Sequence, residues 1–510
     1  MLAKVKSYAL IGLTGFPVDV EVDVSNGLPS FEIVGLPDAS VKEAKERVRS
    51  AIRNSGKKYP NVKVTVNLAP ADVKKQGSYL DLAIAIGILT ASNSEAERLD
   101  DSYVLIGELS LDGTIRAISG LLPMLISAKN NGSTKFIVPY ENAVEASYVL
   151  GTEVYALKNL TEAVALLQGK GEFEPVKSSN YDTALYESSL VNDLSFVKGQ
   201  AFAKRALEVA VAGGHNILFE GPPGAGKSMM AKCIPSIMPK MSFEEALETT
   251  KIHSVAGVLR NDEGIIKYRP FMTPHHTASH VAIVGGGSNA MPGVISLAHN
   301  GVLYLDEMPE YPRKVLECLR QPLEDRVITV TRAKASVEYP ASFMLCGSLN
   351  PCPCGNYGSK NKVCKCTVSE IRKYRARLSE PLLDRIDIQV GVEGVVYSDL
   401  VSTKEEESSL DVRKRVEFAR KIQFERFKED SIKTNAEMKE IHIKKYCKLN
   451  AECENILKSS FESLNLSARA RSRIIKVART IADLAFSEHI LPEHILEAVG
   501  YRSNSSRWRL

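Results

Sequence analysis

The sequence has no long hydrophobic run and no strong excess of charge of one sign. None of its apolar stretches reaches the roughly 18 residues that a membrane-spanning helix needs. The first residues, MLAKVKSYALIGLTGF, lack the apolar core of a signal peptide and are typical of a strand. We therefore expect a cytoplasmic protein with no membrane partner. The net charge of +4 is too small to indicate nucleic-acid binding, which would have to depend on local basic patches.

Internal repeats and low-complexity tracts are also missing, and cysteine is sparse. With 510 residues, of which 44% are hydrophobic and 25% charged, the chain has the composition of a globular protein and the length of about two to four domains. In a cytoplasmic protein the nine cysteines are expected to be thiols or metal ligands rather than disulfides.

Patterning divides the chain into four segments. Residues 1–170 alternate strand patterns such as VDVEVDV with helical patterns, which predicts an α/β or α+β domain. The polar residues 171–190 are interpreted as a linker. Residues 191–392 alternate helices with short apolar strands, NILFE, VLYLDE and SFMLCGSLN, as expected for a parallel sheet covered on both faces. Residues 393–510 begin acidic and serine-rich and then show helical spacing, so we expect a helical domain.

A glycine-rich stretch, GPPGAGKS, follows the strand NILFE and opens the helical stretch MMAKCI. This is a complete P-loop in the strand–loop–helix context that the motif needs. Its backbone N–H groups cradle phosphates, Lys227 reaches the β- and γ-phosphate oxygens, and the hydroxyl of Ser228 binds Mg²⁺. The sequence therefore predicts a site for ATP and Mg²⁺. The predicted residues are Gly221, Pro222, Pro223, Gly224, Ala225, Gly226, Lys227 and Ser228.

Polar residues end the next two of these strands. Asp306 and Glu307 follow the apolar stretch GVLYL, and an acid there meets the metal held by the P-loop hydroxyl. We assign Asp306 to Mg²⁺ and Glu307 to orienting and deprotonating the attacking water; two solvated acids at a strand end are the alternative. Asn350 ends the strand SFMLCGSLN and would hold the water or the γ-phosphate, unless it is only a turn residue before Pro351.

The stretch LLDRID places Arg385 between Asp384 and Asp387. The planar fork of an arginine matches phosphate oxygens. The alternative is an ion pair with one of the two aspartates, which contributes under about 1 kcal/mol if it is exposed.

Four cysteines follow Asn350 in the stretch CPCGNYGSKNKVCKC. Cys352 and Cys354 form one C-x-C pair, and Cys364 and Cys366 form a second pair after nine residues. Four thiolates can close a tetrahedral structural zinc site, whereas free thiols in a surface loop are the alternative. We expect such an ion to shape the region beside Asn350 and to take no part in chemistry.

The stretch RVITVTRAKASVEYP, residues 326–340, alternates like a β-hairpin and carries Arg332 and Lys334 near its tip. Basic side chains at such a tip can hold a phosphate backbone without reading bases. A solvated surface hairpin is the alternative.

Five longer stretches together resemble one family. They are GLPSFEIVGLPDASVKEAKERVRSAI, RPFMTPHHTASHVAIVGGG, PGVISLAHNGVLYLDE, NPCPCG and LSARARSRIIKVARTIADL. On these stretches the chain resembles the ComM/YifB proteins, magnesium-chelatase-like AAA+ ATPases, over nearly its whole length. The resemblance implies a homohexameric ATP hydrolase that acts as a DNA helicase and drives branch migration when incoming single strands recombine in natural transformation. The fold it implies is α/β, a P-loop AAA+ core with a C-terminal helical lid, plus an N-terminal Lon-protease-like α+β domain.

The same resemblance implies roles for individual residues. Asn350 is similar to the first sensor of AAA+ ATPases. Arg385 lies in an LLDR-like motif, whose arginine reaches the ATP of the neighbouring subunit. Arg469, in the sequence S-A-R of the helical region, resembles the second sensor and would contact phosphate, also between subunits. Rings of the helicase type place the hairpin that carries Arg332 and Lys334 in the central pore, where it would meet single-stranded or branched DNA.

The N-terminal region is similar to Lon-type protease domains, and residues 107–132 are part of this resemblance. Lon proteases use a serine and a lysine, but Tyr79 falls at the serine position and Leu122 at the lysine position, and the neighbouring Ser78 is out of register. A Ser–Lys dyad needs both groups within hydrogen-bond reach. We therefore expect a catalytically inactive domain that serves oligomerisation or DNA handling.

Two other functions are alternatives to the DNA motor. One is the motor of a magnesium-chelatase-type complex, and the other is an ATP-gated scaffold. The chelatase motor lacks a Lon-like domain, and a scaffold that only binds ATP has no need of the carboxylate of Glu307.

Overall fold

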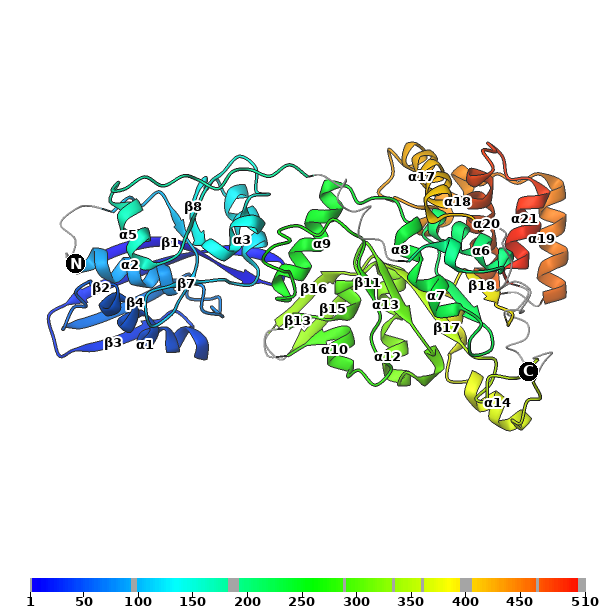
Figure 1. The fold of residues 1–510 in the computed structure, drawn as a ribbon, viewed down its shortest axis with the longest axis horizontal. Coiled ribbons are helices and arrows are strands. Elements are labelled where there is room, and N and C mark those ends of the chain that lie inside the picture. Colours follow the sequence, from blue (N-terminus) through cyan, green and yellow to red (C-terminus); the bar gives the residue numbers. More distant parts are fainter. Residues whose placement is uncertain are drawn as a thin grey trace.

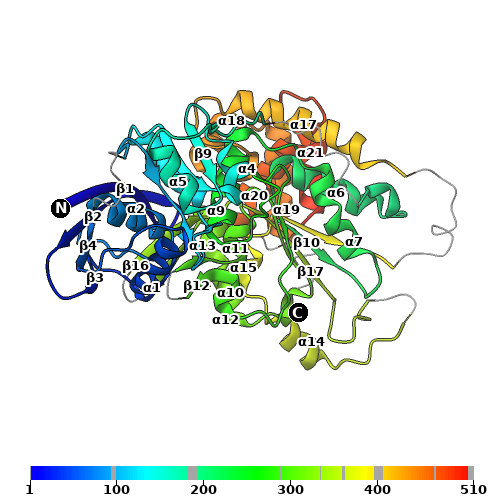
Figure 2. The same ribbon diagram turned by 60° about the vertical axis from the view of Figure 1, so that its left-hand side comes forward.

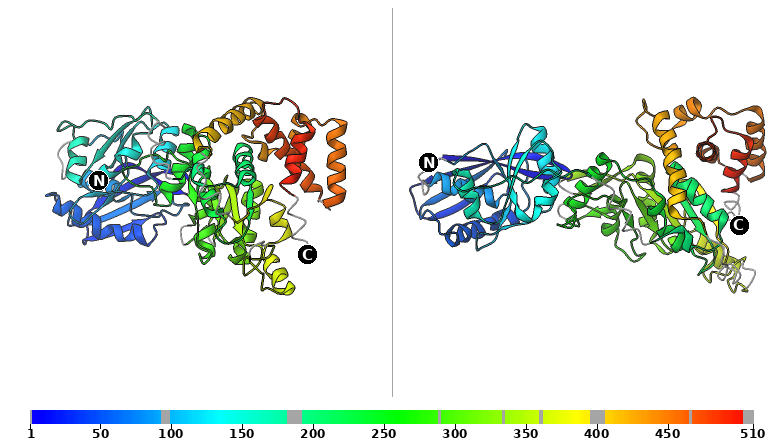
Figure 3. Two further views of the ribbon diagram at one scale, coloured as in Figure 1. Left: turned by 45° about the vertical axis from the view of Figure 1, so that its right-hand side comes forward. Right: turned by 45° about the horizontal axis from the view of Figure 1, so that its top comes forward.

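Three parts follow one another along the molecule in the computed structural model: an N-terminal sheet, a parallel sheet, and a group of C-terminal helices (Figure 1). The views of Figure 3 keep the N-terminal sheet and the C-terminal helices on opposite sides of the parallel sheet. The structure describes residues 2–92, 99–181, 192–287, 290–332, 335–358, 362–394, 406–464 and 467–502.

The N-terminal sheet has seven strands in the order β3-β4-β2-β1-β5-β8-β9. The strands are β1 (Leu2–Ile11), β2 (Thr14–Ser25), β3 (Ser30–Val34), β4 (Lys63–Ala69), β5 (Val104–Leu105), β8 (Lys135–Pro139) and β9 (Glu153–Leu157). β1, β2 and β4 pair antiparallel, and the remaining pairs are parallel. The predicted strand VDVEVDV lies in β2, and its alternating residues are buried because successive side chains of a strand point to opposite faces.

Helices pack on this sheet. They are α1 (Ala39–Asn54), α2 (Asp81–Ala91), α3 (Leu121–Asn130), α4 (Ala143–Ala146) and α5 (Leu160–Leu167), and a short ribbon, β6 (Glu108–Leu109) with β7 (Ile115–Arg116), lies between α2 and α3 along the chain. α2 has buried residues all round, as expected for a helix enclosed in a core. A Cβ at Gly87 would stand 2.6 Å from Cγ2 of Val22, so glycine permits the close approach of α2 to β2.

The second sheet has five strands, all parallel, in the order β11-β14-β17-β10-β18. They are β10 (Ile217–Glu220), β11 (Phe271–Met272), β14 (Val302–Leu305), β17 (Met344–Leu349) and β18 (Ile388–Gly391). The three predicted apolar strands are therefore confirmed as β10, β14 and β17, and Figure 2 shows β10 beside β17. Glu220 pairs with Leu349, and Leu305 with Gly347, so the carboxyl ends of these strands lie at one edge of the sheet.

Short helices and two hairpins surround the parallel sheet. The helices are α6 (Ala201–Gly213), α7 (Lys227–Lys232), α8 (Ile234–Ile237), α9 (Phe243–Val255), α10 (His280–Val284), α11 (Val294–Leu297), α12 (Arg313–Cys318), α13 (Arg320–Asp325), α14 (Val368–Arg375) and α15 (Glu380–Leu383). The hairpins are β12 (Gly285–Gly286) with β13 (Met291–Pro292), and β15 (Val327–Arg332) with β16 (Ala335–Pro340).

In the described residues after 406 the only regular structure is helical, as the sequence predicts. The helices are α17 (Ser409–Arg426), α18 (Glu440–Tyr446), α19 (Ala451–Leu464), α20 (Ala468–Leu484) and α21 (Pro492–Gly500). Ile474 and Ile481 of α20 share one hydrophobic core with Ile217 of β10 and Ala206 of α6, so a movement of these helices is transmitted to β10.

The predicted linker is described only in part. Residues 172–181 contain no helix or strand, and the rest of the predicted segment lies outside the described residues. The N-terminal part instead contacts the P-loop part through α3 and α9, where the backbone N–H of Gly120 donates to the carbonyl of Ser254 at 3.0 Å. In the part of the chain that the structure describes, no helix is both long and apolar enough to cross a membrane.

A buried ion network in the C-terminal helices gives a stability prediction. The carboxylate of Asp483 accepts hydrogen bonds from Arg426 at 2.8 Å, Arg479 at 3.0 Å and Asn435 at 2.8 Å, and its side chain is fully buried. Asp483→Ala should lower the free energy of unfolding by about 3–5 kcal/mol, because it leaves buried guanidinium charge unpaired. Chemical denaturation followed by circular dichroism measures this loss.

Asp411→Ala is the matched control, since Asp411 forms an exposed pair with Lys414 on α17. Removing that pair should change stability by under about 1 kcal/mol. Equal effects of the two substitutions would show that the Asp483 network does not stabilise the helices.

Candidate functional site

The glycine-rich loop 221–226 leads from the carboxyl end of β10 into α7. Gly224 and Gly226 have φ angles of +78° and +89°, a left-handed conformation that glycine adopts without strain. No described atom lies within 4 Å of a Cβ placed at either position, so the loop needs glycine there for its conformation and not for space. The N–H of Gly221 donates to the carbonyl of Leu349 at 3.2 Å, and the N–H of Ala225 donates to the carbonyl of Pro222 at 3.3 Å. Backbone amides of glycine-rich loops at the start of a helix are typical ligands of phosphate oxygens.

Lys227 is the first residue of α7, and its side chain turns back over the loop. Its Nζ donates to the carbonyls of Gly221 at 2.6 Å and Pro222 at 2.9 Å, and to Oδ1 of Asn350 at 3.1 Å. Burial lowers the pKa of this ammonium group, and the nearby Asp306 opposes the shift. Lys227 therefore joins the P-loop to the end of β17.

Asp306 lies beyond the end of β14 and is linked to the P-loop by hydroxyl groups. Its Oδ2 accepts a hydrogen bond from Oγ of Ser228 at 3.1 Å, and its Oδ1 accepts one from Ser348. The hydroxyl of Tyr304 donates to the same Ser228 oxygen at 3.1 Å. Burial by itself raises the pKa of Asp306. The hydrogen bonds from these three hydroxyls lower this pKa by a larger amount, so that the net shift is downward. An ionised carboxylate beside a hydroxyl is a donor set that suits Mg²⁺.

Glu307 is exposed, and its backbone has a φ of +49°, which is unusual for a residue other than glycine. Its backbone N–H donates to Oδ1 of Asp306 at 3.1 Å and to Oγ of Ser348 at 3.2 Å. Strained conformations of this kind persist where the surroundings hold them, and they occur often at functional sites. The structure thus brings the predicted Lys227, Asp306, Glu307 and Asn350 to one edge of the sheet.

Sequence reasoning missed two hydroxyl residues of this site, Tyr304 and Ser348. Each stands two positions before a predicted residue, Asp306 or Asn350, on a buried strand. Because side chains of a strand alternate between faces, positions two apart point the same way. A serine inside the otherwise apolar stretch MLCGSL was the available signal for Ser348.

Arg385 lies at the other edge of the parallel sheet. It follows α15 and precedes β18, whose first residue, Ile388, pairs with Ile217 at the start of β10. The guanidinium is buried, pairs with Glu324, and donates to the carbonyl of Pro381 at 2.6 Å. Since the strands run from this edge toward the P-loop, Arg385 is separated from the P-loop of its own chain by the length of β10.

The alternative ion pairs considered for Arg385 are wrong, because its acidic partner is Glu324 and not Asp384 or Asp387. The carboxylate of Asp387 instead accepts a hydrogen bond from Arg473 at 2.6 Å and one from the backbone N–H of Asn216 at 3.1 Å. The sequence could not show this, since Glu324 and Arg473 are far from Arg385 and Asp387 along the chain.

Arg469 is exposed at the beginning of α20 and belongs to the surroundings of Arg385. Burial lowers the pKa of Arg385, and Glu324 opposes this shift. Three neighbouring arginines lower the pKa further: Arg320, Arg469 and Arg473. Arg469 lies one turn before Arg473 on α20, and Arg473 pairs with Asp387, two residues after Arg385. The two arginines assigned to phosphate by resemblance are therefore near each other, at the edge opposite the P-loop.

The predicted hairpin is confirmed as β15 and β16, which pair antiparallel with Arg332 opposite Ala335. The side chain of Arg332 and the whole of Lys334 lie outside the described residues. At the base of the hairpin the hydroxyl of Tyr339 donates to the carbonyl of Ala290 at 2.9 Å, which fixes the hairpin to the segment after β12.

The positions that correspond to the Lon serine and lysine hold no dyad. Tyr79 is largely buried, and burial raises its pKa to about 12, so that its phenol stays protonated. Leu122 is buried in the core, and the hydroxyl of Ser78 donates to Glu108. Among the contacts of the described residues, no lysine bonds to Ser78.

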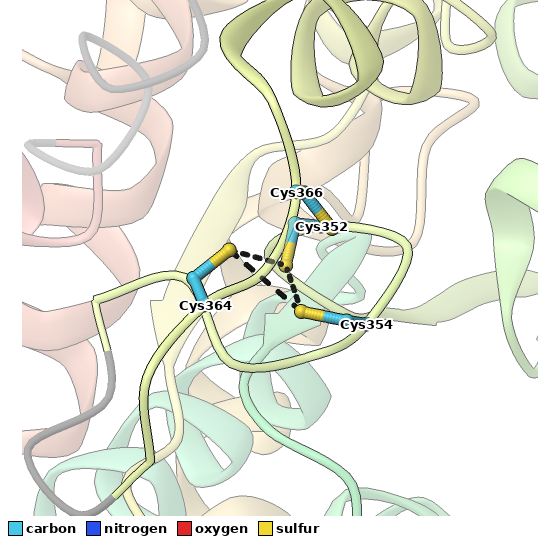
Figure 4. Close-up of side chains that lie close together, drawn as sticks. All are labelled: Cys352, Cys354, Cys364 and Cys366. Carbon is cyan, nitrogen blue, oxygen red and sulfur yellow. Dashed lines mark hydrogen bonds between the residues drawn. The ribbon is translucent and has the colours of Figure 1, made fainter.

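The four predicted cysteines come together at one point (Figure 4). Their sulfur atoms all lie within 4.8 Å of one another, and those of Cys352 and Cys354 are 3.4 Å apart. All four are free thiols. Backbone N–H groups of Lys365 and Asn356 lower the pKa of Cys354 to about 6. For Cys364 and Cys366 a backbone hydrogen bond also lowers the pKa, but burial and hydrogen bonds to the neighbouring sulfurs outweigh it, so that the pKa of each is raised. A coordinated metal ion would be needed to hold all four side chains as thiolates.

Models of the magnesium chelatase family match most of the chain. The model of magnesium chelatase, subunit ChlI, matches residues 193–400, a second ChlI model matches 20–142, and the ChlI C-terminal model matches 406–502. YifB of Escherichia coli and the competence protein ComM of Haemophilus influenzae are each 43% identical to this chain, with 98% of this chain and 97% of each relative covered. The chain belongs to the ComM/YifB family.

A third relative matches over a shorter length. Lon protease 2 of Bacillus subtilis is 27% identical over 168 residues, which is 30% of each chain. The predicted fold class of this ComM/YifB family member is therefore confirmed: an AAA+ domain of the magnesium chelatase type with a parallel sheet, C-terminal helices, and Lon-protease-like homology.

The hydroxyl of Ser348 gives a test of the metal site. Ser348→Ala removes a hydrogen bond that orients Asp306, and losing such a partner of a metal ligand weakens metal binding about 10- to 100-fold. The Mg²⁺ concentration for half-maximal ATP hydrolysis should rise by that factor. Ser342→Ala, near the start of the same strand, is the control and should leave the Mg²⁺ dependence unchanged. If ATP hydrolysis by both variants depends in the same way on the Mg²⁺ concentration, Ser348 does not contribute to the predicted metal site.

Proposed function

We propose that this ComM/YifB-family protein is a cytoplasmic, ATP-driven DNA motor that works as a homohexameric ring and promotes branch migration when incoming DNA recombines. The observation that carries the proposal is the position of Arg385 before β18, at the sheet edge opposite the P-loop. Arg469 lies nearby, one turn before the Arg473 that pairs with Asp387. A chain arranged in this way needs the arginines of a neighbour to complete its nucleotide site. The name of the ComM relative, a competence protein, supports a role in DNA uptake and recombination.

The P-loop edge has the groups that ATP hydrolysis requires. The loop amides and Lys227 bind the phosphates, and Ser228 and Asp306 would hold Mg²⁺, which would neutralise the negative charge of the phosphates. The exposed carboxylate of Glu307 orients the attacking water and takes its proton. Asn350 positions Lys227 through their 3.1 Å hydrogen bond and marks the place of the γ-phosphate.

Arg385 acts on the ATP of the adjoining subunit. A guanidinium supplied between subunits stabilises the charge that develops on the transferring phosphoryl group, and it accelerates hydrolysis about 10³–10⁵-fold. Arg469, which is exposed at the beginning of α20, supplies a second phosphate contact. Hydrolysis in such a ring depends on assembly, because a single chain holds only part of each site.

The β15–β16 hairpin contacts the DNA backbone in the ring pore through Arg332 and Lys334. Contacts to phosphates bind DNA irrespective of sequence, as a motor that moves along strands requires. The N-terminal region has lost the protease dyad and serves assembly or DNA handling.

A magnesium-chelatase motor is the second candidate, because models of the ChlI subunit match this chain. ATP hydrolysis measured with single-stranded, duplex and branched DNA separates the two. Stimulation that is strongest with branched DNA is the outcome for the DNA motor, whereas a chelatase motor is indifferent to all three.

We also infer that the four-cysteine cluster binds a structural Zn²⁺. In a tetrahedral site with Zn–S bonds of about 2.3 Å, the sulfur atoms lie about 3.8 Å apart. The separations of 3.4 Å between Cys352 and Cys354, and of 3.7 Å from each of these to Cys364, are close to that value. Four thiolates favour zinc or iron over magnesium and calcium.

Mixing two inactive variants tests the shared site. Arg385→Ala should reduce ATP hydrolysis about 10³-fold or more while nucleotide binding persists, and Lys227→Ala should be inactive because it loses the phosphate contact. A mixture should regain part of the activity, since some sites then combine an intact P-loop with an intact Arg385. Arg377→Ala, which removes an exposed arginine paired with Glu310, is the control and should retain activity. Normal hydrolysis by pure Arg385→Ala would contradict the proposal.

Removing the basic hairpin tip tests DNA contact. Arg332→Ala combined with Lys334→Ala should abolish the stimulation of ATP hydrolysis by DNA and leave the basal rate, because the tip touches DNA and not nucleotide. The control replaces Lys428 and Lys444, two exposed lysines of the helical region, by alanine. Stimulation that survives the hairpin substitutions but not the control substitutions would place the DNA contact elsewhere.

A further inference from the structure

We propose that the four-cysteine loop, closed by one Zn²⁺, braces the P-loop and thereby sets the affinity of the protein for ATP. The proposal rests on the nucleotide site proposed above and gives the metal cluster a task at that site. The cluster begins only two residues after Asn350, whose Oδ1 accepts a hydrogen bond from Lys227.

The loop has little of its own to keep it ordered. In its described residues, 351–358 and 362–366, there is no helix or strand, and most side chains outside the cluster are exposed. Few residues of the loop are buried, and one of them is Cys352, which is fully buried. Local hydrogen bonds shape the turn around this sulfur: the N–H of Gly355 donates to the carbonyl of Cys352 at 2.9 Å, and the N–H of Tyr357 donates to its Sγ at 3.3 Å. A bound ion would supply the cross-link that apolar contacts do not.

Gly355 brings the loop against the P-loop. A Cβ at Gly355 would stand 2.5 Å from Cδ and 2.8 Å from Cγ of Pro223. Real Cβ atoms do not approach other carbon atoms so closely, so only glycine permits this contact. Pro223 precedes Gly224 in the P-loop, so the cysteine loop contacts the segment that is proposed above to bind the phosphates.

A second connection runs through Arg375 of α14. Its Nη2 lies 3.7 Å from Oε1 of Glu220, the last residue of β10, and 3.4 Å from the carbonyl of Pro351. The guanidinium also stands over the ring of Tyr357, 5.3 Å from its centre, and Arg375 is buried. The cysteine loop thus contacts the end of β10 through Arg375 and Glu220, and the P-loop itself at Pro223.

These contacts make the conformation of the phosphate cradle depend on the metal cluster. Misplacement of a binding group by about 1 Å can change rates or binding by about 100-fold. When the ion is lost, the loop loses its cross-link, Gly355 no longer supports Pro223, and the loop amides lose their fixed directions. Metal-free protein should therefore bind ATP more weakly while its sheets and helices persist.

The test compares two glycines of the same loop. Gly355 and Gly358 have nearly the same φ, +78° and +75°, but no described atom lies within 4 Å of a Cβ at Gly358. Gly355→Ala and Gly358→Ala therefore impose similar backbone strain, and only the first collides with Pro223. We expect Gly355→Ala to keep about one zinc ion per chain and to weaken binding of a fluorescent ATP analogue about tenfold or more. Gly358→Ala should match the unaltered protein in both measurements.

Two metal-free forms extend the test. Removing the ion from the unaltered chain with a strong chelator, and replacing a ligand in Cys364→Ser, should both weaken binding of the analogue about as much as Gly355→Ala does. Zinc content is measured by mass spectrometry of the metal, and circular dichroism shows that each form remains folded. Restored affinity after zinc is returned to the chelated protein supports the brace.

The outcomes separate this inference from the nucleotide site. If the zinc-loaded protein fails to bind the analogue, this result contradicts both the proposed nucleotide site and the proposed support of the P-loop by the cysteine loop. If it binds, but the metal-free forms and Gly355→Ala bind equally well, only the brace is overturned. Purified protein without zinc or another metal, with all four thiols open to alkylation, would also overturn it.

Discussion

Parallel pairing of β10, β14 and β17 is the constraint on which the candidate site depends. Because neighbouring strands run in the same direction, their carboxyl ends meet at one edge, and residues far apart in the chain become neighbours there. The 3.1 Å contacts of Lys227 with Asn350 and of Ser228 with Asp306 both cross between strand ends. A shift of one strand by a residue would turn these side chains to the other face and separate the groups.

The same direction of the strands separates the chain's own arginines from its phosphate cradle. Arg385 stands before β18, at the edge where the strands begin. Arg469 lies one helical turn before Arg473, which pairs with Asp387. A charged group cannot act across the length of a sheet that is filled with apolar side chains. The architecture therefore suits an assembly in which each subunit completes the site of the next, and the helices that share the core with β10 can transmit the change.

Local motifs could be predicted well. The P-loop, the acids after β14, the β15–β16 hairpin and the cysteine cluster each depend on residues that are close in the sequence, and the structure places all of them as expected. Contacts between distant segments could not be predicted. Glu324 as the partner of Arg385 and the contact of Gly355 with Pro223 join segments whose proximity no local pattern shows. Strand alternation places Ser348 on the same face as Asn350, but the bond of its hydroxyl to Asp306 depends on the pairing of β14 with β17.

Strands, helices and the chemical groups at their ends can be predicted from the chain alone, because periodicity and short motifs depend on neighbouring residues. Which groups share an edge of the sheet, and which lie at opposite edges, depends on how the strands are ordered in three dimensions. The contact of the cysteine loop with the P-loop also depends on this three-dimensional arrangement. These relations follow from strand order and packing, which are set by the burial of apolar surface over the whole chain rather than by any single segment.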